Sequence, residues 1–136
     1  MQHIIDQIDV NVGKLRTLYN RYEVTEVGLK RIYMKLGPDP YPSSWEMNFP
    51  AIDYKNERIA NSILQLHNLL IHERSNGNLR RCKSSAEIKH SIERILGTPI
   101  LTGYFLLALL SFNEHFLKFE NAIKNEEDYR LLFMFQ

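Results

Sequence analysis

Histidines and carboxylates gather in the middle of the chain, and they are the first side chains to consider as ligands or catalysts. The group consists of His67, His72, Glu73, Glu87 and His90. His67 and His72 are five positions apart, which is about 140° around a helix, so their rings do not converge on one ion. Glu87 and His90 form a single Glu-x-x-His pair, whereas di-iron bundles need two such pairs and two further carboxylates. We therefore expect no metal site and no cofactor.

His67 is also the first candidate for a catalytic residue. It lies between Ile63 and Leu70 on the apolar face of a predicted helix, where a lone histidine is more often a hydrogen-bonded core residue. Glu73 and Arg58 are the side chains that would complete a site around it. The sequence contains no zinc-protease, phosphate-loop, nucleophile-elbow or dinucleotide-binding motif. An enzyme with an unrecognised site near His67 is therefore the third function that we consider, and we expect no enzymatic activity.

Positive charge is concentrated in two stretches, although the whole chain is almost neutral, with 17 Lys and Arg against 16 Asp and Glu. Residues 14–35 and residues 74–94 each contain six basic and two acidic residues, which leaves a net charge of +4 in each stretch. If the two stretches share a face, they can bind phosphates or an acidic protein; otherwise they are ordinary solvated faces. The candidate contacts are Arg74, Arg80, Arg81, Lys83, Lys30 and Arg31.

Residues 14–36 loosely resemble a helix-turn-helix motif, with Val24 and Thr25 at the turn and a basic second segment. That resemblance implies binding to nucleic acid, which is our alternative function. Amphipathic helix pairs joined by a short turn also occur in many helical bundles, so the pattern fits a purely structural role as well.

Apolar residues at helical spacing predict five helices. These cover residues 3–23, 26–36, 51–73, 85–96 and 99–123. Ser84 and Glu87 form a capping-box pattern at the start of the fourth helix, and Gly97 ends it. Thr98 and Pro99 then favour the start of the fifth helix, whose first half is apolar on every side. The expected fold is all-α: a single-domain helical bundle over residues 1–136 with a central apolar helix.

Apolar side chains outside these helices are candidates for a protein interface. Two segments carry them, a proline-rich loop at residues 37–50 and an apolar tail at residues 126–136. The side chains selected are Tyr41, Trp45 and Phe49 in the loop and Leu132, Phe133 and Phe135 in the tail. Aromatic groups on a proline-stiffened loop suit an interface, and equally they can seal the ends of a bundle. The tail is a candidate surface for a homodimer.

These patterns favour a small helical protein that binds another protein, as a regulator, an inhibitor or an assembly factor. The single cysteine, Cys82, excludes an internal disulfide and suits a reducing compartment, so we expect the cytoplasm. No apolar stretch approaches the roughly 20 residues that span a bilayer, so we expect no membrane partner. Nucleic acid remains the alternative partner.

Overall fold

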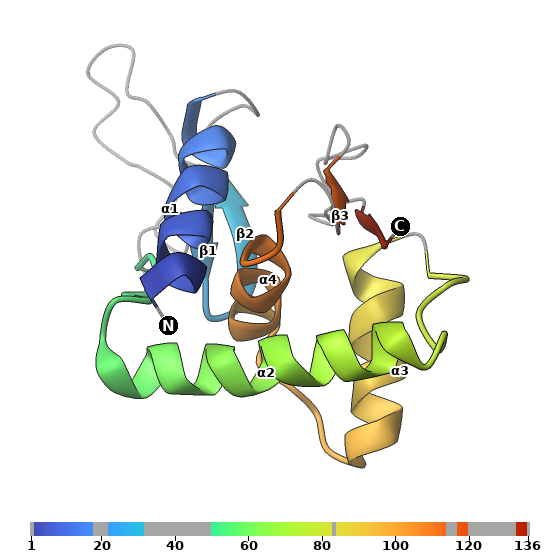
Figure 1. Cartoon of the computed structure of the whole chain (residues 1–136). Helices are drawn as coiled ribbons and strands as arrows, with labels where there is room; N and C mark the ends of the chain where they lie inside the picture. Colours follow the sequence, from blue (N-terminus) through green and yellow to red (C-terminus); the bar gives the residue numbers. More distant parts are fainter. Residues whose placement is uncertain are drawn as a thin grey trace, which may run out of the picture.

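The computed structural model describes residues 2–17, 22–31, 50–82, 84–113, 117–119 and 133–135, and this part of the chain is mostly helical. Its elements are, in order, α1 (Gln2–Thr17), β1 (Tyr22–Thr25), β2 (Gly28–Arg31), α2 (Glu57–Ser75), α3 (Ser85–Leu96), α4 (Thr102–Leu110), β3 (Leu117–Phe119) and β4 (Phe133–Phe135) (Figure 1). In Figure 1, α1 and the β1–β2 hairpin stand at one end of α2, α3 stands at the other end, and α4 lies between them. Among the described residues, none of the helices has the length and apolar character needed to cross a membrane.

Helix α4 is buried along nearly its whole length. Gly103 and residues 105–110 are all buried, and α4 contacts α1, α2, α3 and both strands of the hairpin. The side chains that these helices bury completely are Ile8 and Leu15 of α1, Ile63 and Leu70 of α2, and Ile88 and Ile92 of α3. Because burial of one such side chain contributes about 2 kcal/mol, α4 and its neighbours account for a large share of the hydrophobic stabilisation.

The N-terminus of α4 lies against the hairpin at a point where a side chain does not fit. The N–H of Gly103 donates to the carbonyl of Glu26 at 3.2 Å, so the hairpin supplies an acceptor that a capping side chain supplies in other helices. A Cβ atom on Gly103 would lie 1.9 Å from the carbonyl oxygen of Thr25 and 2.6 Å from Cδ1 of Ile52. The close approach of α4 to the hairpin therefore requires glycine at this position.

The C-terminus of α4 is capped by a side chain of α1. Nδ2 of the buried Asn11 donates to the carbonyls of Leu110 at 2.7 Å and Phe112 at 3.2 Å. The hydroxyl of Ser111 donates to the carbonyl of Ala108 at 2.5 Å. A helix end leaves its last carbonyls without partners inside the helix, and these bonds satisfy two of them, those of Ala108 and Leu110, together with the carbonyl of Phe112 just beyond the helix.

The structure confirms the predicted boundaries of α3. Oγ of Ser84 accepts a hydrogen bond from the N–H of Glu87 at 3.3 Å, and Gly97 ends the helix with a left-handed φ of 72°. Both signals depend only on neighbouring residues, which is why the sequence reveals them.

The predicted helix over residues 26–36 is wrong. Residues 22–31 form an antiparallel hairpin in which Val24 lies opposite Leu29 and Thr25 lies opposite Gly28. The two-residue turn and the φ of 121° at Gly28 suit a hairpin, and burial of Val24 and Leu29 outweighs the weak helical spacing. The helix-turn-helix resemblance of residues 14–36 fails with it, because a strand replaces its second helix.

Three other predicted helices are shorter in the structure. Helix α1 ends at Thr17 and residues 22–25 form β1, although the prediction extended the helix to residue 23. Helix α2 begins at Glu57 because Oδ1 of Asn56 accepts from the N–H groups of Arg58 and Ile59, whereas the prediction began at residue 51. Ile52 instead donates its N–H to the carbonyl of Val24 at 3.0 Å.

Helix α4 begins three residues later than predicted and ends at Leu110. The predicted helix over residues 99–123 is wrong beyond that point, since residues 117–119 form β3. Strand β4, in the predicted apolar tail, pairs antiparallel with β3 of the same chain, with Leu117 opposite Phe135. The structure thus describes four helices where the sequence predicts five.

Replacement of Gly103 tests the contact between α4 and the hairpin. Gly103→Ala should lower the free energy of unfolding by about 3 kcal/mol, because the new methyl group collides with the Thr25 carbonyl. The matched control is Gly13→Ala in α1, where a Cβ would meet no atom within 4 Å and alanine should stabilise the helix by about 0.5–1 kcal/mol. Urea unfolding measures both changes, and equal stability of the two variants would contradict the packing.

Candidate functional site

A groove with a volume of about 350 Å³ opens between α3 and the first turns of α4. It is lined by Ser85, Ala86, Lys89, His90 and Glu93 of α3 and by Thr102, Phe105 and Leu106 of α4. Phe105 and Leu106 give it an apolar floor, and the charged residues of α3 form its rim. Concave sites of this size, with apolar walls and a few polar groups, commonly bind ligands or partner side chains. We call this site the α3–α4 groove.

The groove exists because α3 has two different faces. Ile88 and Ile92 are fully buried and lie on the side that packs against α4. Ala86, Lys89 and Glu93 recur at intervals of three and four residues, which places them together on the neighbouring side of the helix. The groove runs along this second side.

Glu93 ties the turn after α3 back to the helix. Its Oε2 accepts a hydrogen bond from the N–H of Ile100 at 2.8 Å, and its Oε1 lies 3.2 Å from Nζ of Lys89. The hydrogen bond from Ile100 is the main reason why the pKa of Glu93 is lowered; Lys89 acts in the same direction and burial opposes it. The carboxylate therefore fixes the spacing between α3 and the start of α4, on which the shape of the groove depends.

Apolar side chains are exposed beside the groove, at the turn from α3 to α4. Ile95, Leu96 and Leu101 are 48%, 44% and 54% exposed. Within the described residues six large hydrophobic side chains are exposed, and half of them fall in these seven positions. Leu96 lies three residues after Glu93, on the groove side of α3, and Leu101 directly precedes Thr102. We call these three residues the α3–α4 turn surface.

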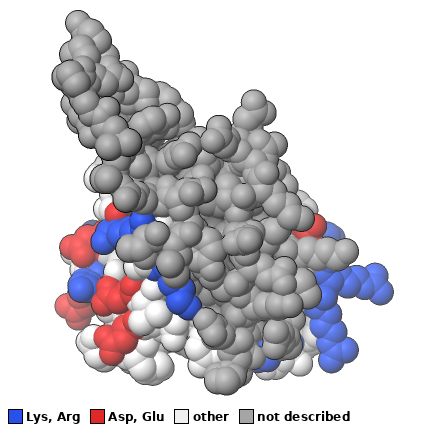
Figure 2. Space-filling view, turned by 90° about the horizontal axis from the view of Figure 1, so that it is seen from above, with Lys and Arg blue, Asp and Glu red and all other residues white. Residues whose placement is uncertain are grey.

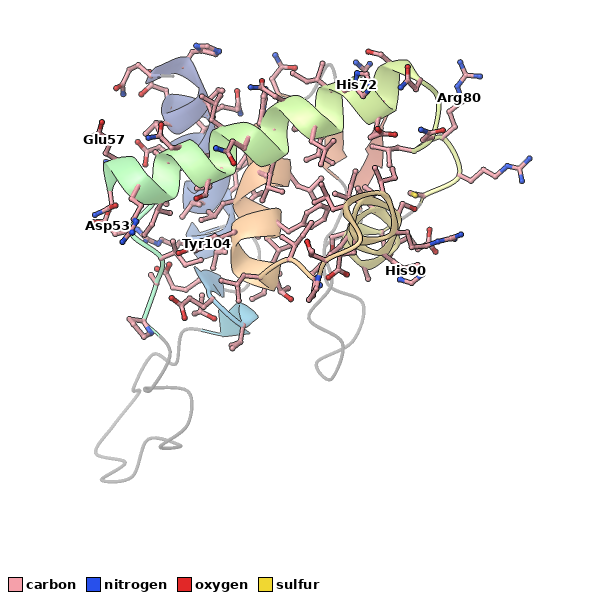
Figure 3. The ribbon with its side chains drawn as sticks, turned by 90° about the horizontal axis from the view of Figure 1, so that it is seen from below. Asp53, Glu57, His72, Arg80, His90 and Tyr104 are labelled. Atoms are coloured by element: carbon pink, nitrogen blue, oxygen red, sulfur yellow. The ribbon has the colours of Figure 1, made fainter. Side chains whose placement is uncertain are left out.

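The second basic stretch lies at the far end of α2. Arg74 belongs to the last turn of α2, and Arg80 and Arg81 are exposed in the connection to α3. Figure 3 shows His72 and Arg80 at this end of α2, with Asp53 and Glu57 at the opposite end. Lys83 lies outside the described residues.

The two basic stretches do not form one patch in the described part of the chain. Lys30 and Arg31 belong to β2, and the hairpin packs on α1 at the end of α2 that is remote from α3 (Figure 1). Arg16 of the same stretch lies 2.5 Å from Glu23, whose hydrogen bond raises the pKa of the guanidinium. In Figure 2, basic side chains on the left are interspersed with acidic ones, whereas those on the right are mostly basic. Among the described side chains, those of Arg80 and Arg81 are exposed after the last turn of α2, and we call this part the positive end of the molecule.

His67 is hydrogen-bonded at the C-terminal end of α4. Its Nδ1 lies 2.5 Å from Oγ of Ser111, and its ring stacks on Phe112 with 4.4 Å between the centroids. Because the Ser111 hydroxyl donates to the carbonyl of Ala108, it accepts the hydrogen bond from Nδ1–H of His67. Burial lowers the pKa of His67, and the charge of His3 acts in the same direction. In this arrangement the neutral imidazole orients the serine without withdrawing its proton.

The structure does not bring Glu73 and Arg58 to His67. Glu73 lies six residues further along α2, about 240° around the helix, where it is buried and accepts a hydrogen bond from Asn78 at 2.5 Å. Arg58 is exposed in the first turn of α2, on the side opposite His67. The three side chains considered for catalysis therefore have separate surroundings.

Other candidate residues from the sequence fall in different places. Among the described residues, no three His, Cys, Asp or Glu side chains are grouped so that they could hold a metal ion. Phe133 and Phe135 belong to β4, and the homodimer through the apolar tail stays a prediction. The remaining candidates for a protein interface, Tyr41, Trp45, Phe49 and Leu132, lie outside the described residues.

The sequence analysis does not predict the α3–α4 groove. The spacing of Ala86, Lys89 and Glu93 marks one side of α3 and was a usable signal. The floor, formed by Phe105 and Leu106, depends on how α3 packs against α4, which local patterns do not reveal.

No family model matches this chain, and no curated protein or solved structure matches it.

Removal of the Glu93 charge tests how the groove is held. Glu93→Gln should lower the free energy of unfolding at neutral pH by about 1 kcal/mol, because a charged acceptor is lost at a partly exposed site. Since the pKa of Glu93 is lowered in the folded protein, its contribution is present above the unfolded pKa and disappears as the pH falls through the folded pKa. The difference between wild type and variant, measured by urea unfolding at several pH values, should shrink below about pH 4.3.

The control is Glu26→Gln, which removes the same charge from an exposed position in the hairpin turn. The loss of unfolding free energy caused by Glu93→Gln should exceed the loss caused by Glu26→Gln at neutral pH. A loss that is no larger than that of the control, or that does not change in acid, would contradict the role given to Glu93.

Proposed function

We propose that this protein acts by binding another protein through the α3–α4 turn surface and the adjoining groove. The observation that supports this proposal is the exposure of Leu96 and Leu101 beside a site with an apolar floor, with Ile95 exposed at the same turn. Removal of apolar surface from water contributes roughly 25 cal/mol per Å², so a partner that covers these side chains gains free energy. Contiguous exposed apolar groups with a polar rim are typical of interaction sites.

The chemistry of the rim favours a protein partner over a small apolar ligand. Lys89, His90 and Glu93 supply both donors and acceptors around the groove, which suits the mixed polar edge of a protein interface. A chain of this kind would serve as a regulator, an inhibitor or an assembly factor. The single cysteine, Cys82, suits a reducing compartment, and we place the protein in the cytoplasm on that basis.

Affinity capture with matched variants tests the proposal. We compare the proteins that three tagged forms capture from extracts of the source cells. The forms are the wild type, the double variant Leu96→Asp with Leu101→Asp, and the control Val10→Asp. Val10 is 55% exposed on α1, so its substitution introduces one of the two added charges at a comparably exposed apolar position outside the turn surface. We expect at least one partner that wild type and control retain and the double variant loses, and purified partner should repeat this result by calorimetry.

Retention of every captured protein by the double variant would overturn the proposal, provided that circular dichroism shows a wild-type fold. Equal loss of the partners by Val10→Asp would also overturn it, because the effect would then not belong to the turn surface.

A second candidate function is nucleic-acid binding by the positive end of the molecule. The observation that favours it is the exposure of Arg80 and Arg81 next to the last turn of α2, where Arg74 lies. Phosphate contacts release counterions, so such binding should weaken steeply as salt increases. Unchanged low-salt binding of a labelled oligonucleotide by Arg80→Ala combined with Arg81→Ala would exclude this candidate.

A further inference from the structure

Four residues on the groove side of α3 are arranged symmetrically about Ser91. Lys89 and Glu93 lie two positions before and after it, and Ala86 and Leu96 lie five positions before and after it. At 100° per residue, these four side chains fall within about 80° of the helix circumference. From the N-terminus to the C-terminus, this side of the helix presents a small, a basic, an acidic and a large apolar side chain. In an antiparallel copy the same side chains run in reverse order, so that small faces large and basic faces acidic.

Such an order is self-complementary when two copies of the helix run antiparallel. A two-fold contact brings residue i of one copy to residue j of the other and residue j to residue i. With the axis level with Ser91, Lys89 faces Glu93 of the second copy, and Ala86 faces Leu96 of the second copy. Lys89 and Glu93, which lie 3.2 Å apart within each copy, then each meet a second opposite charge across the axis, and each leucine meets the smallest side chain of the stripe.

The surroundings of α3 leave this face accessible in the described structure. Helix α3 stands at the edge of the molecule in Figures 1 and 3, and its principal packing among the described elements is on α4 alone. Leu96 is 44% exposed, the side chains of Lys89 and Glu93 are 21% and 22% exposed, and the α3–α4 groove opens beside Ala86. The groove is therefore placed to receive the leucine of a second copy.

The rim charges also discriminate between partners. Lys89 and Glu93 carry opposite charges, so neither a uniformly acidic partner nor a nucleic acid matches the stripe. A partner fits when it presents the same two charges in reverse order beside a small and a large apolar residue. An antiparallel copy of α3 does so.

We propose that a second copy of this chain binds the groove side of α3, with the two α3 helices antiparallel across a two-fold axis level with Ser91. The inference rests on the proposed function, since it names one protein partner for the same surface. It uses α3, and not the apolar tail for which the sequence predicts a dimer. A helix of 12 residues is about 18 Å long, so the contact belongs to the small class of interfaces and the dimer dissociates on dilution.

Sedimentation velocity over a range of protein concentrations tests the dimer with two charge reversals. Lys89→Glu and Glu93→Lys should each weaken self-association by about tenfold or more, because each homodimer then places like charges opposite one another. A mixture of the two variants should recover the dimer, since one copy supplies two acidic and the other two basic residues. Simple damage to either fold would not be repaired by mixing.

A disulfide trap gives a second measurement, because Glu93→Lys also removes the acceptor for Ile100. The variant carries Ala86→Cys and Leu96→Cys in a Cys82→Ser background. The two new thiols are ten residues apart on one rigid helix, about 15 Å, so they cannot join within one chain. We expect a covalent dimer on mild oxidation, and the control with Ala86→Cys in the same background should stay mostly monomeric.

Three results overturn the inference: a monomer at every concentration, association that neither charge reversal weakens, and a disulfide trap that stays monomeric. These failures are distinct from failure of the proposed function. If the protein is monomeric while Leu96→Asp with Leu101→Asp still loses a different captured protein, the surface binds a partner but that partner is not a second copy.

Discussion

Burial of α4 with both of its ends held by distant segments is the constraint on which the rest of the structure depends. At its N-terminus, the missing side chain of Gly103 lets the helix approach the carbonyl of Thr25 and donate to Glu26. At its C-terminus, Nδ2 of Asn11 in α1 donates hydrogen bonds to the carbonyls of Leu110 and Phe112. A helix as apolar as α4 has no stable position in water, so α1, α2, α3 and the hairpin are organised by the need to cover it.

The same constraint fixes the orientation of α3, the helix on which the proposed binding surface lies. Ile88 and Ile92 of α3 are fully buried, and Glu93 fixes the turn that leads into α4. The remaining side of α3 is held in a defined orientation at the edge of the molecule, with the groove at its base and the exposed apolar turn at its end. A rigid helix that presents apolar and charged groups at fixed spacing loses little entropy when a partner binds, which favours recognition through this face.

The elements that the sequence predicts correctly depend on local chemistry, and the errors concern contacts between distant residues. Ser84 and Gly97 mark the ends of α3 because caps act within one turn of a helix. The continuous helix beyond Leu110 was predicted from apolar spacing, whereas Asn11, about 100 positions earlier in the chain, ends α4. The hairpin was missed because Leu29 also fits a helical stripe, and its pairing with Val24 becomes evident only with Gly28 in its positive-φ conformation. The residue spacing in the sequence indicates which side of α3 lines the groove. The floor of the groove cannot be predicted in this way, because it depends on how α3 packs against α4.

Hydrogen exchange followed by mass spectrometry, on wild-type protein at low and high concentration, tests the central claim most directly: a core organised by α4 supports a contact face on α3. We expect the amides of residues 106–110 to exchange slowly at both concentrations, because they open only with global unfolding. We also expect protection to rise with concentration in residues 86–101 and to stay constant in α1. Rapid exchange in α4, or protection in residues 86–101 that does not depend on concentration, would contradict the account.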